Sequence, residues 1–74
     1  MIKFDKLWET MKKKKITTYR LRETYGIDNE IIRRMKANKS TTTKTLNRFC
    51  AILNCSLEEI AEYVPDEIAP PEEN

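Results

Sequence analysis

Basic side chains crowd the middle of this chain, and they are the residues whose chemistry is most evident. Residues 12–48 contain twelve Lys or Arg against three Asp or Glu, a net charge of +9. Residues 49–74 contain seven Asp or Glu and no Lys or Arg, a net charge of −7. A basic segment of this density attracts polyanions and is typical of nucleic-acid binding, although a merely solvated charged surface is the alternative. We expect the acidic part to point away from the polyanion.

The other residues that could do chemistry argue against a metal site or catalysis. Cys50 and Cys55 are five positions apart and the chain has no histidine, so a tetrahedral zinc site has too few ligands. We place Cys50 in the core and Cys55 in or beside it, with redox sensing as the alternative, because a cytosolic protein rarely keeps a disulfide. Without histidine or a glycine-rich phosphate loop, we expect no enzyme, no cofactor and no small-molecule site.

Length and composition favour one small all-α domain. Seventy-four residues are near the lower limit for a core that folds without disulfides or metal. One Gly, three Pro that all fall in the last ten residues, and 35% charged residues suit helices better than a sheet. The sequence shows no signal-peptide pattern and no long apolar stretch, so we expect a cytoplasmic protein with no membrane contact.

Apolar residues at helical spacing predict three short helices in the first half of the chain. The first runs from about Phe4 to Lys14, and we expect Trp8 to pack in its core stripe rather than anchor a partner. Thr17 caps a second helix through about Tyr25, which the single glycine, Gly26, ends in the left-handed conformation. A third helix spans about Asn29–Ala37. The expected inward residues of these helices are Phe4, Leu7, Trp8, Met11, Leu21, Tyr25, one or both of Ile31 and Ile32, and Met35.

Caps and further stripes complete the predicted architecture. Asp28 is the expected N-cap of the third helix, and Asn38 is expected to end it in the left-handed conformation. Thr42 caps a fourth helix, and Ser56 with Glu59 forms a capping box that opens a fifth. Their expected inward residues are Leu46, Phe49, Cys50 and Leu53, then Leu57, Ile60, Ala61 and Val64. Residues 1–64 should form the domain, and the acidic, proline-rich residues 65–74 a disordered tail.

The order and spacing of these motifs resemble the phage-repressor-like helix-turn-helix domains of the Xre and Cro type. The resemblance covers about residues 4–64 and rests on Gly-Ile at 26–27, Ile-x-x-Met at 32–35, Asn-Lys at 38–39 and Thr-Leu-x-x-Phe-Cys-x-Ile-Leu-x-Cys-Ser-Leu-Glu-Glu-Ile at 45–60. It implies a five-helix, lambda-repressor-like fold. It also implies a sequence-specific DNA-binding transcriptional regulator of bacteria or mobile elements, expected to be a repressor, with the third helix in the major groove. A protein-interaction or antitoxin-like accessory module on the same scaffold is the alternative.

The resemblance also implies which residues meet double-stranded DNA. The outward positions of the third helix, expected to read bases, are Asn29, Glu30, Arg33 and Arg34. Arg can pair with guanine O6 and N7, Asn with adenine N6 and N7, and Glu with cytosine N4. The expected phosphate contacts flank this helix and are Thr17, Thr18, Tyr19, Lys36, Lys39, Thr42, Thr43 and Lys44.

Two residues depart from the family pattern. Arg22 occupies a position, four residues before Gly26, where these domains usually have a small residue, so its stem points outward or the helices cross more loosely. Glu30 places a carboxylate on the end of the helix that should approach DNA. Three roles remain open for it: a cytosine reader, a first-turn partner of the helix dipole, or a sign that this chain recognises a protein.

A single domain of this kind reads only a few base pairs, which predicts an assembly. We expect a homodimer, or a complex with a partner protein, on a pseudo-palindromic site. The expected dimer face is the fifth helix and the region around Tyr63. The basic run 12–15 cannot lie on one helix face, and we expect solvation to be its main role, with added phosphate attraction as the alternative.

Overall fold

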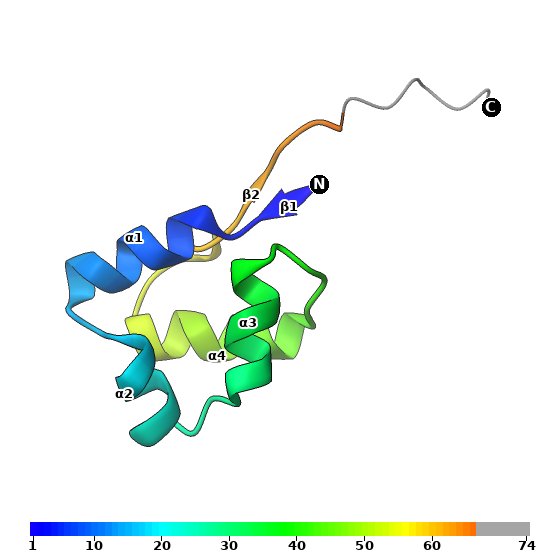
Figure 1. The fold of residues 1–74 in the computed structure, drawn as a ribbon. Coiled ribbons are helices and arrows are strands. Elements are labelled where there is room, and N and C mark those ends of the chain that lie inside the picture. The colour runs from blue at the N-terminus through cyan, green and yellow to red at the C-terminus, as the bar shows by residue number, and fades with distance from the viewer. Residues whose placement is uncertain (67–74) are drawn as a thin grey trace.

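The computed structural model describes residues 1–66, so residues 67–74 of the expected tail lie outside the described residues. The elements in chain order are β1 (Ile2–Lys3), α1 (Asp5–Lys14), α2 (Thr18–Glu23), α3 (Asn29–Lys36), α4 (Thr43–Leu53), the 3-10 helix η1 (Leu57–Glu59) and β2 (Glu62–Tyr63). In Figure 1, α1 crosses the top of the domain, α2 and α3 lie below it, and α4 passes behind α3. The two short strands extend together toward the upper right.

Side-chain caps begin three of the helices at the residues that the sequence predicts. The Thr17 hydroxyl accepts a hydrogen bond from the Arg20 N–H at 3.1 Å, which starts α2. The Asp28 carboxylate accepts from the Glu30 N–H at 2.8 Å and starts α3. The Thr42 hydroxyl accepts from the Thr45 N–H at 3.1 Å and starts α4. Each cap satisfies one backbone donor that the first turn of a helix leaves without a partner.

Left-handed residues end the helices. Gly26 has φ 68° and Asn38 has φ 57°, as the sequence predicts, and Lys15 and Asn54 adopt the same conformation at φ 59° and 50°. Asn38 has a second role, because its side-chain oxygen accepts a hydrogen bond from the Phe4 N–H at 2.7 Å. The turn after α3 is therefore tied to the start of α1, 34 residues away in the chain.

The core forms where α1, α3, α4 and η1 meet. Its buried apolar side chains, each at most 4% exposed, are Phe4, Leu7, Met11, Leu21, Ile27, Ile32, Met35, Phe49, Leu53 and Ile60. Ile27, directly after Gly26, is the one member that the helical stripes did not include, because it lies in a turn. Trp8, Leu46 and Cys50 pack against this core but are only partly buried.

The expected five-helix fold is wrong at its C-terminal end. Within residues 1–66 the structure has four α-helices, one 3-10 helix and a two-stranded sheet. The capping box of Ser56 and Glu59 does form, but the chain leaves the helical conformation at Ile60. Val64 precedes Pro65, which disfavours helix at the last turn, and Tyr63 suits a strand better than a helix.

Pairing between β1 and β2 takes the place of the missing helix. The strands are antiparallel, with Ile2 opposite Tyr63 and Lys3 opposite Glu62. Ile60 is fully buried as expected, whereas Leu57, predicted to face the core, is 54% exposed. The buried Thr10 hydroxyl donates to the Glu59 carbonyl at 2.6 Å and fixes η1 against α1. Among residues 1–66, no helix has the length and apolar character of a membrane span.

Candidate nucleic-acid interface

The turn between α2 and α3 determines which face of α3 reaches solvent. Gly26 ends α2, and the Ile27 N–H donates to the Leu21 carbonyl at 2.9 Å while the Ile27 side chain enters the core at 2% exposure. This anchor directs Ile32 and Met35 of α3 inward. The opposite face carries the four residues predicted to read bases, and all of them are exposed: Asn29, Glu30, Arg33 and Arg34.

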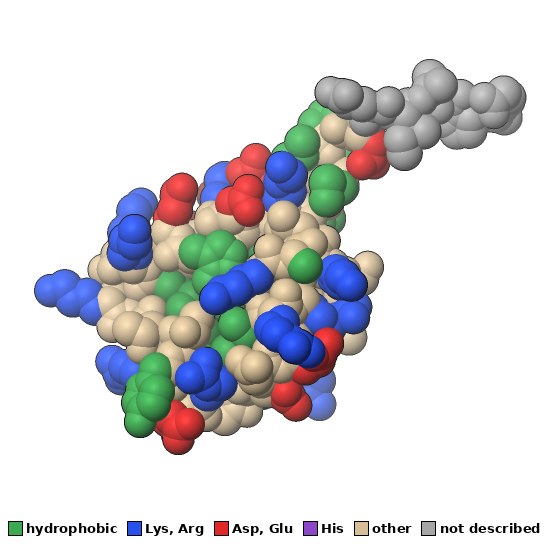
Figure 2. All heavy atoms as spheres, viewed as in Figure 1, with side chains coloured by type: hydrophobic (Ala, Val, Ile, Leu, Met, Phe, Trp, Pro, Cys, Tyr) green, Lys and Arg blue, Asp and Glu red, His purple; other side chains and the backbone are tan. Residues whose placement is uncertain are grey.

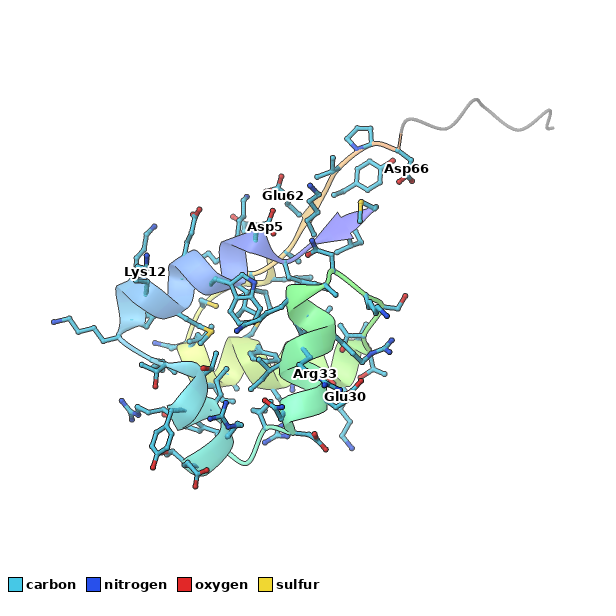
Figure 3. All side chains as sticks on the ribbon, viewed as in Figure 1. Asp5, Lys12, Glu30, Arg33, Glu62 and Asp66 are labelled. Carbon is cyan, nitrogen blue, oxygen red and sulfur yellow. The ribbon has the colours of Figure 1, made fainter. Side chains whose placement is uncertain are left out.

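Two of these residues bind each other. The Arg33 guanidinium forms an ion pair with the Glu30 carboxylate one helical turn away, and the two side chains are 70% and 56% exposed. Figure 3 shows them together on the outward side of α3. Such an exposed pair contributes little to stability, so it does not need to stay intact when another anion approaches. The sequence offered three roles for Glu30 and did not anticipate this one.

Arg34 has a different partner. Its guanidinium donates to the Ser40 carbonyl at 3.0 Å, which connects the last turns of α3 to the loop that leads into α4. Arg33 and Arg34 are therefore not equivalent, although they have the same chemistry and are adjacent. Arg33 is held by an exposed carboxylate, while Arg34 braces the backbone of a loop and keeps its remaining donors for other acceptors.

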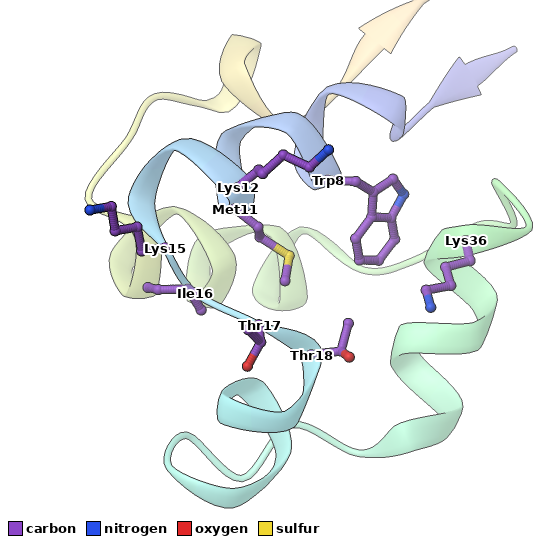
Figure 4. A pocket seen from close by; sticks show the side chains of 8 residues that line it. All are labelled: Trp8, Met11, Lys12, Lys15, Ile16, Thr17, Thr18 and Lys36. Atoms are coloured by element: carbon purple, nitrogen blue, oxygen red, sulfur yellow. The ribbon is translucent and has the colours of Figure 1, made fainter.

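A hollow beside the start of α2 collects further cations. This Trp8 hollow has a volume of ≈ 490 Å³, and its lining residues are Trp8, Met11, Lys12, Lys15, Ile16, Thr17, Thr18 and Lys36 (Figure 4). The Lys36 ammonium lies 5.7 Å from the centre of the Trp8 ring, within the range of a cation–π interaction. Residues predicted to bind phosphate at the start of α2 thus lie around the same hollow as Lys36 at the end of α3.

The basic run 12–15 divides between two surfaces. Lys12 and Lys15 line the Trp8 hollow, whereas Lys13 lines a separate hollow with Glu9, Glu58 and Glu59 as neighbours. The sequence correctly excludes a single face for the run, but it missed Lys12 and Lys15 as members of the candidate interface. Lys15 follows the end of α1 in the left-handed conformation, so helical spacing in the sequence gives no signal that joins it to Lys12.

The loop and helix after α3 supply the remaining predicted contacts. Lys39, Thr43 and Lys44 are exposed, and the Thr42 hydroxyl is already engaged in capping α4, where it also donates to the Thr45 hydroxyl at 3.1 Å. Tyr19 on α2 is 64% exposed. Lys39 and Lys44 therefore place exposed positive charges near the start of α4, and the main role of Thr42 is to cap that helix.

Arg22 and Arg48 show how the chain departs from the expected packing. Arg22 is half-buried on α2 instead of fully exposed. Arg48 reaches from α4 to the end of α2, where its guanidinium donates to the Tyr25 carbonyl at 2.8 Å. An arginine that satisfies a carbonyl beside the Gly26 turn stabilises that turn, a role that the sequence did not reveal.

Acidic side chains gather at the opposite end of the domain. Asp5, Glu62 and Asp66 lie along the start of α1 and the β2 segment in Figure 3, and Glu62 pairs with Lys6 at 3.7 Å. Figure 2 shows blue Lys and Arg side chains spread across the face that carries α2 and α3. Within residues 1–66, carboxylates from both ends of the chain therefore share the acidic end of the domain, together with Lys6.

The cysteines have no metal-site geometry within residues 1–66, where no cluster of three or more His, Cys, Asp or Glu could hold an ion. Both are free and partly buried. Burial, followed by the neighbouring Cys50, raises the pKa of the Cys55 thiol above its ordinary value. A raised pKa keeps the thiol protonated and makes it a poor nucleophile, so a packing role accounts for it.

Comparison with known proteins decides the family. Residues 6–66 match the family model of the Cro/C1-type helix-turn-helix (HTH) DNA-binding domain. The chain belongs to this family. The Cro/C1-type domain described here also superposes on a crystal structure of the transcriptional regulator VanUg, form II, with a TM-score of 0.78 and 25% sequence identity. The match covers 88% of this chain and 87% of that one. Curated protein sequences gave no match.

Proposed function

We propose that this Cro/C1-type domain is a sequence-specific transcriptional regulator that binds double-stranded DNA as a homodimer, with α3 in the major groove and α2 across the backbone. The observation that carries the proposal is the outward face of α3, where Asn29, Glu30, Arg33 and Arg34 are all exposed. Membership of a DNA-binding family and the likeness to a transcriptional regulator support it. Repression is the mode of regulation that the family resemblance led us to expect, and we carry it into this proposal.

Base reading is assigned to the exposed face of α3. Asn29, at the first position of the helix, suits adenine, and Arg33 suits guanine. Glu30 forms an ion pair with Arg33 in the free domain. On DNA, Glu30 either keeps this pair and orients Arg33 toward a guanine, or leaves Arg33 and itself accepts a hydrogen bond from cytosine N4. Arg34 is braced by Ser40 and has donors left for a base or a phosphate.

Phosphate binding is assigned to the cations and hydroxyls on either side of that face. The first group surrounds the Trp8 hollow and consists of Lys12, Lys15, Thr17, Thr18 and Lys36. We add Tyr19, the exposed residue that follows Thr18 in α2. The second group lies at the start of α4 and consists of Lys39, Thr42, Thr43 and Lys44. Two groups of contacts fit the two backbones that border a major groove, and they fix the register of α3 without reading sequence.

Salt dependence of binding to a random-sequence DNA duplex tests the phosphate assignment. Each phosphate contact contributes a slope of about −0.9 in log affinity against log salt. Lys12→Ala and Lys36→Ala should each reduce the magnitude of that slope by about one contact. Lys13→Ala removes the same charge beside Glu58 and Glu59, so it is the matched control and should leave the slope unchanged. Equal slopes for all three variants would reject this part of the proposal.

Sequence preference tests the base-reading assignment. Asn29→Ala and Arg33→Ala should each relax the preference at one base-pair position, while Lys44→Ala should weaken binding to all sequences alike. Loss of a good bidentate pair is worth about 1–3 kcal/mol of discrimination. If the wild-type chain binds all DNA equally and without salt dependence, the scaffold serves instead as a protein-interaction or antitoxin-like module.

A further inference from the structure

The Trp8 hollow combines an apolar floor with a cationic rim. Trp8 and Ile16 in the floor are partly buried, and Met11 is only 4% exposed. Among the described residues, no Asp or Glu lines the hollow, and its volume of ≈ 490 Å³ is typical of a small-molecule site. The cations of the rim are all exposed and are Lys12, Lys15 and Lys36.

The charges of this rim are not neutralised by carboxylates. Every ion pair within residues 1–66 involves other groups. The Lys36 ammonium lies 5.7 Å from the centre of the Trp8 ring, a cation–π contact that leaves its full positive charge available to an anion. Figure 4 shows Lys12 and Lys36 on opposite sides of Trp8, and Lys15 extending away from it. An anionic group beside Trp8 would therefore meet two cations without displacing a carboxylate.

The apolar floor shows what kind of anion suits the hollow. A DNA phosphate can pair with the lysines, but it has no apolar part that covers Trp8, Met11 and Ile16. A flat aromatic ring does, because aromatic rings pack against a tryptophan and a methionine sulfur makes favourable contacts with a ring. Composition led us to expect no small-molecule site. The combination of an apolar floor and unpaired cations in one hollow argues against that expectation.

We infer that the Trp8 hollow binds a small aromatic carboxylate, whose ring rests against Trp8 and Met11 and whose carboxylate pairs with Lys12 and Lys36. The inference rests on the proposed function in one respect, because the same two lysines are assigned there to DNA phosphates. Ligand and DNA therefore compete, and each weakens binding of the other. A ligand of this class regulates the domain by releasing it from DNA.

Fluorescence of Trp8, the single tryptophan of the chain, tests the ligand site directly. Phenylacetate, the probe, should change this fluorescence saturably with a Kd on the order of millimolar, as expected for so few atoms. Phenylacetamide keeps the ring but loses the charge, and acetate keeps the charge but loses the ring. Each of these two controls should bind at least about tenfold more weakly, because each engages only the floor or only the rim.

Charge-removing variants locate the carboxylate. Lys12→Gln and Lys36→Gln should each raise the phenylacetate Kd by about two- to fivefold, the range for one exposed ion pair. Lys13→Gln removes the same charge beside Glu58 and Glu59 in a separate hollow, so it is the matched control and should leave the Kd unchanged. Because these lysines are exposed, circular dichroism should show that all three variants stay folded.

Competition with a random-sequence DNA duplex tests the regulation. Phenylacetate at ten times its Kd should raise the apparent Kd for DNA by about three- to tenfold in fluorescence anisotropy. Sodium acetate at the same concentration matches the ionic strength, and the comparison is made against it. Lys13→Gln should show the same competition as the wild-type chain.

The possible outcomes separate this inference from the proposed function. No saturable change in Trp8 fluorescence overturns the inference, as does a phenylacetamide or acetate Kd equal to that of phenylacetate. Equal effects of Lys13→Gln and Lys36→Gln also overturn it, and so does DNA affinity that phenylacetate changes no more than acetate. DNA binding by the free chain would stand in each of these cases. A chain that binds phenylacetate as expected, but binds no DNA, would support the ligand site and reject the proposed function instead.

Discussion

The outward face of α3 and a hollow between α4 and η1 belong to adjacent elements, yet they are built from opposite chemistry. This α4–η1 hollow is lined by Thr43, Leu46, Asn47, Cys50 and Leu57. The α3 face carries Arg33, Arg34 and Glu30, whose charges are exposed and exchangeable. The hollow is lined by uncharged side chains, with Leu57 projecting beside it. The first surface is chemically suited to a polyanion, whereas the second offers no charge to one. The contrast teaches that one small domain can place a charged and an uncharged surface on adjacent helices.

The two surfaces are held by the same hydrophobic core, so a substitution that unfolds the core should disrupt both surfaces. Phe49 on α4 is fully buried. Phe49→Ala should lower the free energy of unfolding by about 3–5 kcal/mol, because it removes buried apolar area and leaves a cavity. Urea unfolding monitored by circular dichroism measures this loss of unfolding free energy. Asn47→Ala on the exposed side of the same helix is the control and should change stability by less than about 0.5 kcal/mol. Similar losses in both variants would contradict the assigned core.

A change at the α2–α3 turn should affect the DNA-binding surface more than the hollow. Gly26 has φ 68°, and an added Cβ would meet no atom within 4 Å, so Gly26→Ala costs only the left-handed conformation. That cost is about 1–2 kcal/mol in unfolding free energy. Gly26→Asn should cost less, because asparagine tolerates this conformation. Equal stability of the alanine variant and the wild type in urea would show that the turn is not held left-handed.

Removing the carboxylate from the α3 face should sharpen the charge contrast between the two surfaces. Glu30→Gln leaves Arg33 without its ion-pair partner and should change stability by less than about 1 kcal/mol, because the pair is exposed. Affinity for random DNA should rise severalfold at low salt, since one negative charge leaves the interface. Fluorescence anisotropy measures this affinity. A loss of affinity instead would mean that Glu30 positions Arg33 for binding.

The smallest expected effect is a pH dependence at η1. The Ser56 backbone N–H donates to the Glu59 carboxylate at 2.9 Å and lowers its pKa in the folded state. A lowered folded pKa gives stability that is present above the unfolded value of 4.5 and is lost as the pH falls through the folded pKa. Thermal unfolding between neutral and acidic pH should therefore show a decline that Glu59→Gln reduces. An identical decline in the variant would remove Glu59 as its source.

The helix starts could be predicted from sequence because their signals are local. Thr17, Asp28 and Thr42 cap the helices that follow them, and Gly26 and Asn38 adopt the left-handed conformations that their types favour. The exposed face of α3 was expected from the family resemblance, while helical spacing left open whether Ile31, Ile32 or both point inward; Ile32 is buried and Ile31 partly buried. Their roles toward DNA remain a prediction.

The C-terminal segment could not be predicted, because a distant partner determines its structure. Residues 57–64 carry a helical stripe, but β2 pairs with β1, some 60 residues earlier in the chain. Interactions between side chains and groups far away in the sequence could not be predicted either. They are those of Arg48 with the Tyr25 carbonyl, Asn38 with the Phe4 N–H, and Lys36 with Trp8. Local periodicity favours a fifth helix, and the tertiary pairing overrides it.

The most direct test of the central claim is selection of the wild-type chain's preferred sequences from a random library of DNA duplexes. The account predicts enrichment of one two-fold symmetric sequence whose half-site centres are about 10 base pairs, one helical turn, apart. Arg33→Ala should lose the preference at one position in each half-site. Recovery of an unenriched library by the wild-type chain would contradict the claim that the α3 face reads DNA.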